Sequence, residues 1–243
     1  PDRLSVDVGP VISTEAQKRL LDYVERMREA GHRIHQVPVP HAAAQGTFVP
    51  PTLIEIGAIA DLPGEVFGPV LHVLRYERED MEQVIRAVNG TGFGLTFGVH
   101  SRIDETIERA TAASAAGNQY VNRNMIGAVV GVQPFGGHGL SGTGPKAGGP
   151  LYVHRLLAAG TAADVVTGDL AGPVGERNGY ALRPKGAILC IAADPAELSV
   201  QQELVRSTGN RVASAEAEDI AAVLFSGSES DLLELARRMS ERP

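Results

Sequence analysis

The glycine-rich run at residues 127–144 is the segment whose composition points most directly to chemistry. Seven of its eighteen residues are glycine, and it also contains Phe135. Glycine lacks a β-carbon, so such a run can take unusual backbone dihedrals or let a ligand come close to the main chain. Its Gly-x-Gly-x-x-Gly pattern at 137–142 lacks the helix that a dinucleotide-binding turn requires, because Pro145 and Pro150 follow. Two interpretations stay open, a ligand-facing loop and a glycine-rich structural turn.

A second candidate lies at Glu65-Val66-Phe67-Gly68-Pro69, directly before a predicted strand. An ionised carboxylate only accepts hydrogen bonds, and it can take two hydroxyl protons at once. The alternative is that Glu65 is an ordinary solvated residue of a Gly/Pro turn.

The single cysteine and the histidines offer no catalytic or metal centre. Cys190 lies in the apolar sequence Ala187–Ala192, where a thiolate is disfavoured, so we expect it to be structural. One cysteine also forms no internal disulfide. His32 and His35 lie three residues apart without acidic or cysteine companions, so no metal site is predicted.

Strands that alternate with helices predict an α/β fold with a parallel sheet. A capping box at Thr14–Gln17 predicts a helix that ends near Gly31. The predicted strands are residues 69–76, 95–99 and 119–122, and residues 35–39 and 48–56 are β-like segments that their prolines confine to sheet edges or irregular strands. The further predicted helices are 80–90, capped by Asp80, and 103–116.

The chain is predicted to divide into residues 1–159, a linker at 160–185, and a second α/β unit at 186–243. Glycines and prolines without sustained periodicity mark the linker, among them Gly160, Gly168, Gly172, Pro173, Gly175 and Gly179. The second unit starts with an apolar strand at 187–193, and Asp194 and Pro195 then begin a helix. A strand at 221–225 and a helix from its N-cap Ser230 to Arg242 complete the pattern.

Composition excludes several classes of function. The chain has 243 residues, 43% hydrophobic content and a net charge of −7, which argues against a nucleic-acid surface. No apolar stretch approaches the length of a membrane span. Because the sequence begins with Pro1 and not Met, we expect a fragment of a longer protein.

Taken together, these motifs resemble the C-terminal part of the aldehyde dehydrogenase catalytic domain, over roughly residues 1–155. The segments that carry the resemblance are Asp7–Ile12, Glu65–Pro69, Asn89–Thr96, Gly117–Asn124 and Pro134–Gly137. Two further segments, Gly148–Tyr152 and Gly175–Asn178, are similar to the bacterial bifunctional proline utilization A enzymes. In that branch the dehydrogenase oxidises L-glutamate γ-semialdehyde with NAD. The resemblance implies a Rossmann-like catalytic-domain half, followed by the start of a smaller C-terminal Rossmann-like domain.

The resemblance also implies roles for five residues. Glu65 would bind the hydroxyls of the nicotinamide ribose, and Phe67 would help to position the nicotinamide. Backbone N–H groups of Gly127 and Ala128 would hold the substrate carboxylate, and Phe135 would pack against the aliphatic part of the aldehyde. From the residues alone, Phe135 could equally be a core aromatic.

The family's nucleophilic cysteine and general-base glutamate precede these motifs, so the chain is expected to contain no catalytic residue and to be inactive alone. The longer parent would add a flavin-dependent (FAD) proline dehydrogenase domain, form a homo-oligomer and be a cytoplasmic bacterial enzyme. Two alternatives stay open: an aldehyde dehydrogenase for a different acyl group, and a non-catalytic structural or assembly fragment.

Overall fold

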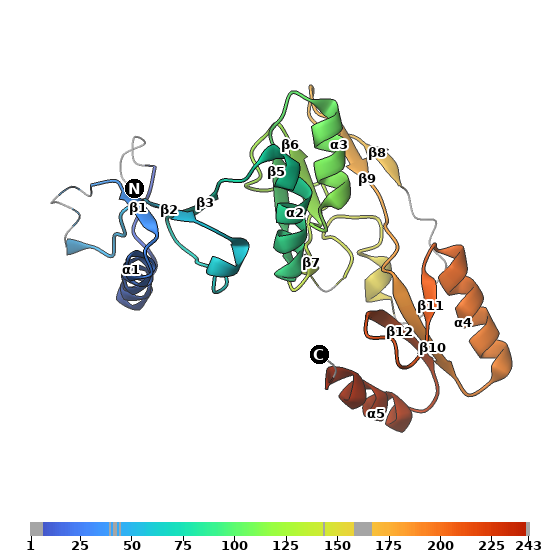
Figure 1. Ribbon diagram of the computed structural model, residues 1–243. Helices are drawn as coiled ribbons and strands as arrows, with labels where there is room; N and C mark the ends of the chain where they lie inside the picture. The colour runs from blue at the N-terminus through green and yellow to red at the C-terminus, as the bar shows by residue number, and fades with distance from the viewer. Residues whose placement is uncertain are drawn as a thin grey trace. The chain divides into compact units, whose positions relative to one another are not determined.

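The computed structural model describes residues 7–38, 40, 43, 45–142, 144–157 and 167–241, which divide into two compact units, Pro1–Val165 and Val166–Pro243. The first unit contains, in chain order, α1 (Thr14–Glu29), β1 (Arg33–Gln36), β2 (Thr52–Ile56), the short 3₁₀ helix η2 (Ile59–Asp61), β3 (Val70–Leu74), η3 (Arg78–Asp80), α2 (Met81–Gly90), β4 (Phe93–Gly94), β5 (Thr96–Val99), α3 (Asp104–Ala113), β6 (Asn118–Val121), β7 (His138–Gly139) and η4 (His154–Leu156) (Figure 1).

The first helix, α1, is amphipathic and is closed at both ends by local hydrogen bonds. The predicted capping box at Thr14–Gln17 is wrong by one residue: Ser13 is the N-cap, and its Oγ accepts a hydrogen bond from the N–H of Ala16 at 3.1 Å. Directly after the helix, Gly31 has a φ of 91°, the left-handed conformation that favours glycine. The buried face of the helix consists of Leu20, Tyr23, Val24 and Met27.

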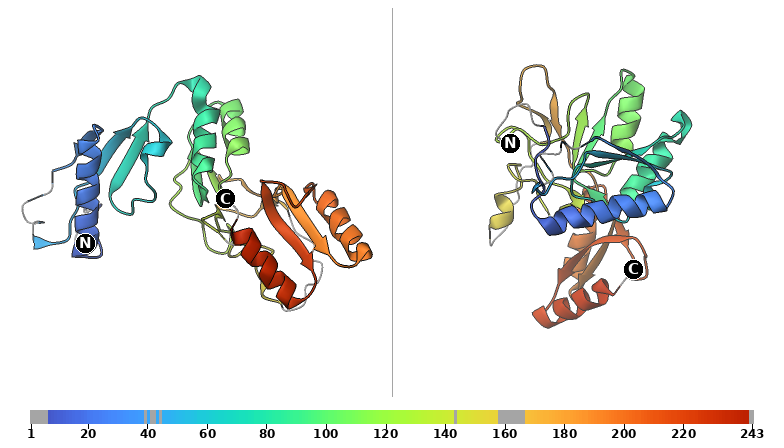
Figure 2. Two further views of the ribbon diagram at one scale, coloured as in Figure 1. Left: turned by 60° about the horizontal axis from the view of Figure 1, so that its bottom comes forward. Right: turned by 90° about the vertical axis from the view of Figure 1, so that its left-hand side faces the viewer.

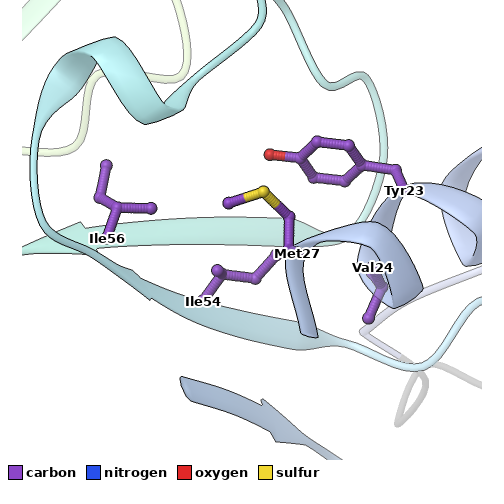
Figure 3. Close-up of a cluster of buried hydrophobic side chains, with 5 residues drawn as sticks. All are labelled: Tyr23, Val24, Met27, Ile54 and Ile56. Atoms are coloured by element: carbon purple, nitrogen blue, oxygen red, sulfur yellow. The ribbon is translucent and has the colours of Figure 1, made fainter. Parts of the chain in front are cut away.

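The sheet that α1 covers has the order β1-β2-β3, with β2 antiparallel to β1 and parallel to β3. Alternate residues of β2 are buried, and Ile54 is fully enclosed. In Figure 3 the side chains of Tyr23 and Met27 point from α1 toward Ile54 and Ile56. Val66 and Val70 pack against the same cluster, so this core also fixes the loop that leads into β3.

The remainder of the first unit pairs β5 with β6 in parallel and β4 with β7 in antiparallel. Figures 1 and 2 show α2 and α3 side by side, and Arg109 Nη2 lies 2.8 Å from Glu82 Oε1 between them. Asp80 precedes α2 as predicted, but its side chain makes no capping hydrogen bond. Through the β4–β7 pair, residues 138 and 139 of the glycine-rich run lie beside residues 93 and 94.

The second unit is a small parallel α/β layer preceded by a hairpin. Its elements are β8 (Gly168–Leu170), β9 (Asn178–Tyr180), β10 (Ala187–Ala192), α4 (Pro195–Ser207), β11 (Arg211–Ala213), β12 (Ile220–Ser226) and α5 (Glu229–Ser240). Strands β10, β11 and β12 are all parallel in the order β11-β10-β12, and Figures 1 and 2 show α4 and α5 on opposite sides of them.

Three predictions for this unit meet different outcomes. The Asp194 cap is confirmed, because its Oδ1 accepts a hydrogen bond from the N–H of Ala196 at 3.0 Å. The cap of α5 is Ser228 rather than Ser230. The predicted linker contains the antiparallel β8–β9 hairpin, which its glycines and prolines did not reveal. Residues 158–166 and Arg242, parts of the predicted linker boundary and last helix, lie outside the described residues.

The α/β fold class is confirmed, with parallel pairing in the β2–β3, β5–β6 and β10-centred ladders. Among the described residues, antiparallel pairing occurs between β1 and β2, between β4 and β7, in the β8–β9 hairpin and at the isolated Phe135–Ala147 bridge. Within the described residues no helix combines the length and the apolar character needed to cross a membrane.

Candidate functional site

The loop between η2 and β3 presents Glu65 and Phe67 outward from a fixed backbone. Val66, between them, packs against the core cluster beneath α1, whereas Glu65 is exposed and the Phe67 side chain is 83% exposed. A β-carbon at Gly68 would lie 2.5 Å from Leu20 Cδ1, so a larger residue there would have to displace the buried Leu20 side chain of α1. The loop is thus held from beneath while its two candidate residues face solvent.

The Glu65 carboxylate is available to a ligand. No hydrogen bond or ion pair to it occurs among the described residues. A neighbouring exposed aromatic, Phe67, gives the loop a flat apolar surface beside an anionic acceptor. This combination suits a polyhydroxylated ligand that also carries a planar ring.

Gly127 and Ala128 lie in the loop after β6. In the described part of the chain, the backbone N–H groups of these two residues have no protein acceptor. A β-carbon at Gly127 would have no heavy atom within 4 Å, so packing does not demand glycine there. The next turn is closed by its own bonds, with Gln133 N–H donating to Val129 O and Val129 N–H donating to Gln133 Oε1, both at 2.9 Å. Two adjacent free donors beside open space can bind an anion without a charged side chain.

Packing requires glycine at two positions after Phe135, Gly137 and Gly142. A β-carbon at Gly137 would lie 2.2 Å from Ser141 O, and one at Gly142 would lie 2.1 Å from Gly137 O. These contacts are backbone against backbone, which no side-chain movement relieves. The glycine-rich run is therefore open at Gly127 and tightly packed at Gly137 and Gly142, and the ligand-facing interpretation of its start stays a prediction.

Phe135 lies on a bridge between two segments of this turn. Its N–H donates to Ala147 O at 3.0 Å, and the Ala147 N–H donates to Phe135 O at 2.9 Å. The residue is half-buried and belongs to neither hydrophobic core cluster of the described chain. The backbone of Phe135 is thus fixed, while its ring keeps a partly open side.

Lys146 is the residue that the sequence reasoning missed. Its Nζ donates to Gly136 O at 2.8 Å, to Asn118 Oδ1 at 3.1 Å and to Gly117 O. Burial lowers the pKa of this ammonium. A signal was present, since Lys146 is the one charged residue of the sequence between Arg123 and Arg155.

The predicted site residues fall into two groups. Glu65 and Phe67 share one loop, and Gly127, Ala128 and Phe135 belong to another; within the described residues no hydrogen bond or ion pair joins the two loops. No cluster of three or more metal-binding side chains occurs in the described ranges. Cys190 lies in β10 of the second unit, and burial raises the pKa of its thiol.

The sequence profile of the Aldehyde dehydrogenase family matches residues 1–161. The chain belongs to the aldehyde dehydrogenase family. Among solved structures, a mutant of proline utilization A from Bradyrhizobium japonicum has a TM-score of 0.55 and 56% identity, and the match covers 60% of this chain and 14% of that one. The aldehyde dehydrogenase fold and the resemblance expected from the sequence are therefore confirmed.

Two similar relatives extend the comparison. Bifunctional protein PutA of Rhizobium meliloti is 45% identical over 92% of this chain and 22% of the relative. The 1-pyrroline-5-carboxylate dehydrogenase 2 of Bacillus subtilis (strain 168) is 34% identical over 68% of this chain and 32% of the relative. The chain thus spans between a fifth and a third of the length of these aldehyde dehydrogenase relatives.

Proposed function

We propose that this chain is a segment of an NAD-dependent dehydrogenase that oxidises L-glutamate γ-semialdehyde to glutamate in proline catabolism. The observation that carries the proposal is the 45% identity to a bifunctional PutA over 92% of the chain. The match to a 1-pyrroline-5-carboxylate dehydrogenase supports the same substrate, because the name of that relative refers to the dehydrogenase activity alone.

The proposed nicotinamide side is the Glu65 loop. An exposed carboxylate without a protein partner fits the two ribose hydroxyls, and Phe67 supplies an apolar surface for the nicotinamide ring. When bound, NAD accepts a hydride from the substrate carbon. The role of this chain is to hold the ribose end in place, and the adenine and pyrophosphate contacts fall to residues outside it.

The proposed aldehyde side is the loop of Gly127 and Ala128 with Phe135. The two free N–H groups bind the substrate carboxylate, and small side chains leave room for it. Phe135, held by its bridge to Ala147, packs against the methylene groups between carboxylate and aldehyde. This arrangement orients the aldehyde without contributing a nucleophile.

The longer enzyme completes the proposal. Residues 1–159 form the C-terminal part of the catalytic domain, 160–185 join the units, and 186–243 begin the C-terminal domain. A flavin-dependent (FAD) proline dehydrogenase domain would supply the semialdehyde, as the word bifunctional in the name of the relatives suggests. A cytoplasmic homo-oligomer is part of the same proposal.

The test is a substrate panel on the full-length enzyme. Formation of NADH is measured with glutamate γ-semialdehyde, with succinate semialdehyde and with propanal. The proposal expects the highest kcat/KM for glutamate γ-semialdehyde. Preference for either of the other aldehydes would assign the enzyme to a different aldehyde dehydrogenase subfamily.

A further inference from the structure

The Lys146 ammonium ties the segment that carries Phe135 to the start of β6. All three of its N–H groups have acceptors: the backbone carbonyls of Gly117 and Gly136, and Asn118 Oδ1. Gly136 directly follows Phe135 in the chain, and its carbonyl belongs to the Gly136–Gly137 peptide. The ammonium therefore holds the peptide next to the proposed substrate-facing aromatic.

The shape of the turn is adapted to this lysine. A β-carbon at Gly136 would lie 3.1 Å from Lys146 Cα and 3.3 Å from its Cγ, so the lysine stem lies against the glycine. A β-carbon at Gly117 would lie 3.0 Å from Lys146 Nζ and 2.2 Å from Gly136 O. Two glycines thus make room for one side chain and its acceptors.

The electrostatics of the contact are unusual for a half-buried lysine. No carboxylate pairs with Lys146 among the described residues, and all of its acceptors are neutral. Hydrogen bonds from a charged donor are stronger than neutral ones, and an isolated ammonium is costly to bury unless they are complete. The lysine is therefore better explained by these three bonds than by charge neutralisation.

A second donor reinforces the same carbonyl. Asn118 Nδ2 donates to Gly136 O at 3.0 Å and to Leu95 O at 2.8 Å, and Asn118 is buried. The carbonyl of Gly136 therefore accepts two hydrogen bonds, while the Phe135–Ala147 bridge fixes the peptide on its other side. Together these bonds leave the Phe135 backbone little freedom to rotate.

We propose that Lys146 is a positioning residue of the aldehyde site: by holding the Gly136 carbonyl, it keeps Phe135 oriented toward the aliphatic part of the substrate. The contact between Phe135 and the substrate rests on the proposed function. The three hydrogen bonds from Lys146, here called the Lys146 clamp, do not depend on it. Because the methylene groups of any aldehyde meet Phe135, the clamp serves charged and neutral substrates alike.

The experiment compares Lys146→Met, Lys146→Gln and the exposed control Lys185→Met in the full-length enzyme. Methionine keeps the stem and removes all donors, whereas glutamine keeps an N–H₂ donor. For Lys146→Met we expect the KM for both glutamate γ-semialdehyde and propanal to rise about tenfold, the loss expected for hydrogen bonds from a charged group, with the KM for NAD unchanged. The aldehyde KM of Lys146→Gln should lie between those of Lys146→Met and the unmodified enzyme, and all KM values of Lys185→Met should match those of the unmodified enzyme.

Hydrogen–deuterium exchange of the peptide spanning residues 134–142 supplies a readout that does not depend on activity. We expect faster exchange in Lys146→Met and unchanged exchange in the control. Equal exchange rates in Lys146→Met and in the control Lys185→Met overturn the Lys146 clamp. Faster exchange with an unchanged aldehyde KM overturns the positioning role. So does faster exchange in which the aldehyde KM and the NAD KM rise, and kcat falls, by the same factor.

Two further outcomes separate this inference from the proposed function. If the unmodified enzyme oxidises propanal but not glutamate γ-semialdehyde, the proposed function fails, while the propanal and exchange measurements still judge Lys146. If Lys146→Met raises the KM for glutamate γ-semialdehyde but not for propanal, the ammonium acts on the substrate charge, and the positioning role is wrong.

Discussion

The Glu65 carboxylate faces solvent with no protein partner among the described residues, so its substitution should affect a ligand rather than the fold. Glu65→Gln keeps one acceptor oxygen and loses the charge that strengthens a bond from a ribose hydroxyl. We expect kcat/KM at limiting NAD to fall about tenfold in the full-length enzyme, with the melting temperature unchanged.

A matched control for this substitution is Glu79→Gln, which removes an exposed carboxylate from η3. It should leave both quantities unchanged. If Glu65→Gln behaves like this control, Glu65 is an ordinary loop residue and the ribose assignment is wrong.

Ala128 tests the anion site. In Ala128→Leu the larger side chain should exclude the substrate carboxylate from the free N–H groups, at a cost of about 2–4 kcal/mol in kcat/KM for glutamate γ-semialdehyde. Propanal has no carboxylate and should lose much less. Steady-state kinetics of the full-length enzyme with both aldehydes measure the difference.

The control is Val130→Leu, a position in the same loop whose side chain is 96% exposed. Equal losses with both aldehydes in Ala128→Leu would mean that the loop shapes the site generally. No loss with either would place the loop away from the substrate.

At the scale of elements, the contact between α1 and β3 carries a pH dependence. His72 Nε2 lies 2.8 Å from Tyr23 Oη, and burial, with a smaller contribution from the charge of His32, lowers the pKa of His72 below 6.5. The unfolded chain therefore binds more protons than the folded chain just below pH 6.5, so the free energy of unfolding should fall as the pH drops through that window.

This prediction is checked by urea unfolding of the chain at neutral and acidic pH, with NMR titration of the histidine side chains. His72→Gln keeps a hydrogen-bonding group and removes the titration, so its stability should depend less steeply on pH. His100→Gln, at an exposed position, should behave like the unmodified chain. A pKa for His72 at or above 6.5 would contradict the prediction.

At the scale of the whole molecule, we predict that this chain alone oxidises no aldehyde. Its only cysteine lies in β10, where burial raises the pKa of the thiol, and a protonated thiol is a poor nucleophile. The measurement is NADH formation by the purified chain with glutamate γ-semialdehyde. Activity that Cys190→Ser abolishes would falsify this assignment of Cys190 as structural.

The sequence by itself determined the alternation of helices and strands, the α/β class and the family resemblance. These features depend on local periodicity and on short motifs, such as the apolar face of α1 and the Asp194 cap of α4, which are encoded by neighbouring residues. The boundaries of the other caps were wrong because Ser13 and Thr14, or Ser228 and Ser230, are chemically equivalent caps, and only the backbone dihedrals decide between them.

Only the tertiary structure decided which parts of the glycine-rich run are open and which are packed. Gly127 and Gly137 are the same residue type in the same run, yet Gly127 lies beside open space and Gly137 lies against the Ser141 carbonyl. The role of Lys146 was likewise invisible, since its acceptors at positions 117, 118 and 136 are distant along the chain. Contacts between residues far apart in sequence arise from folding of the chain, so no local pattern specifies them.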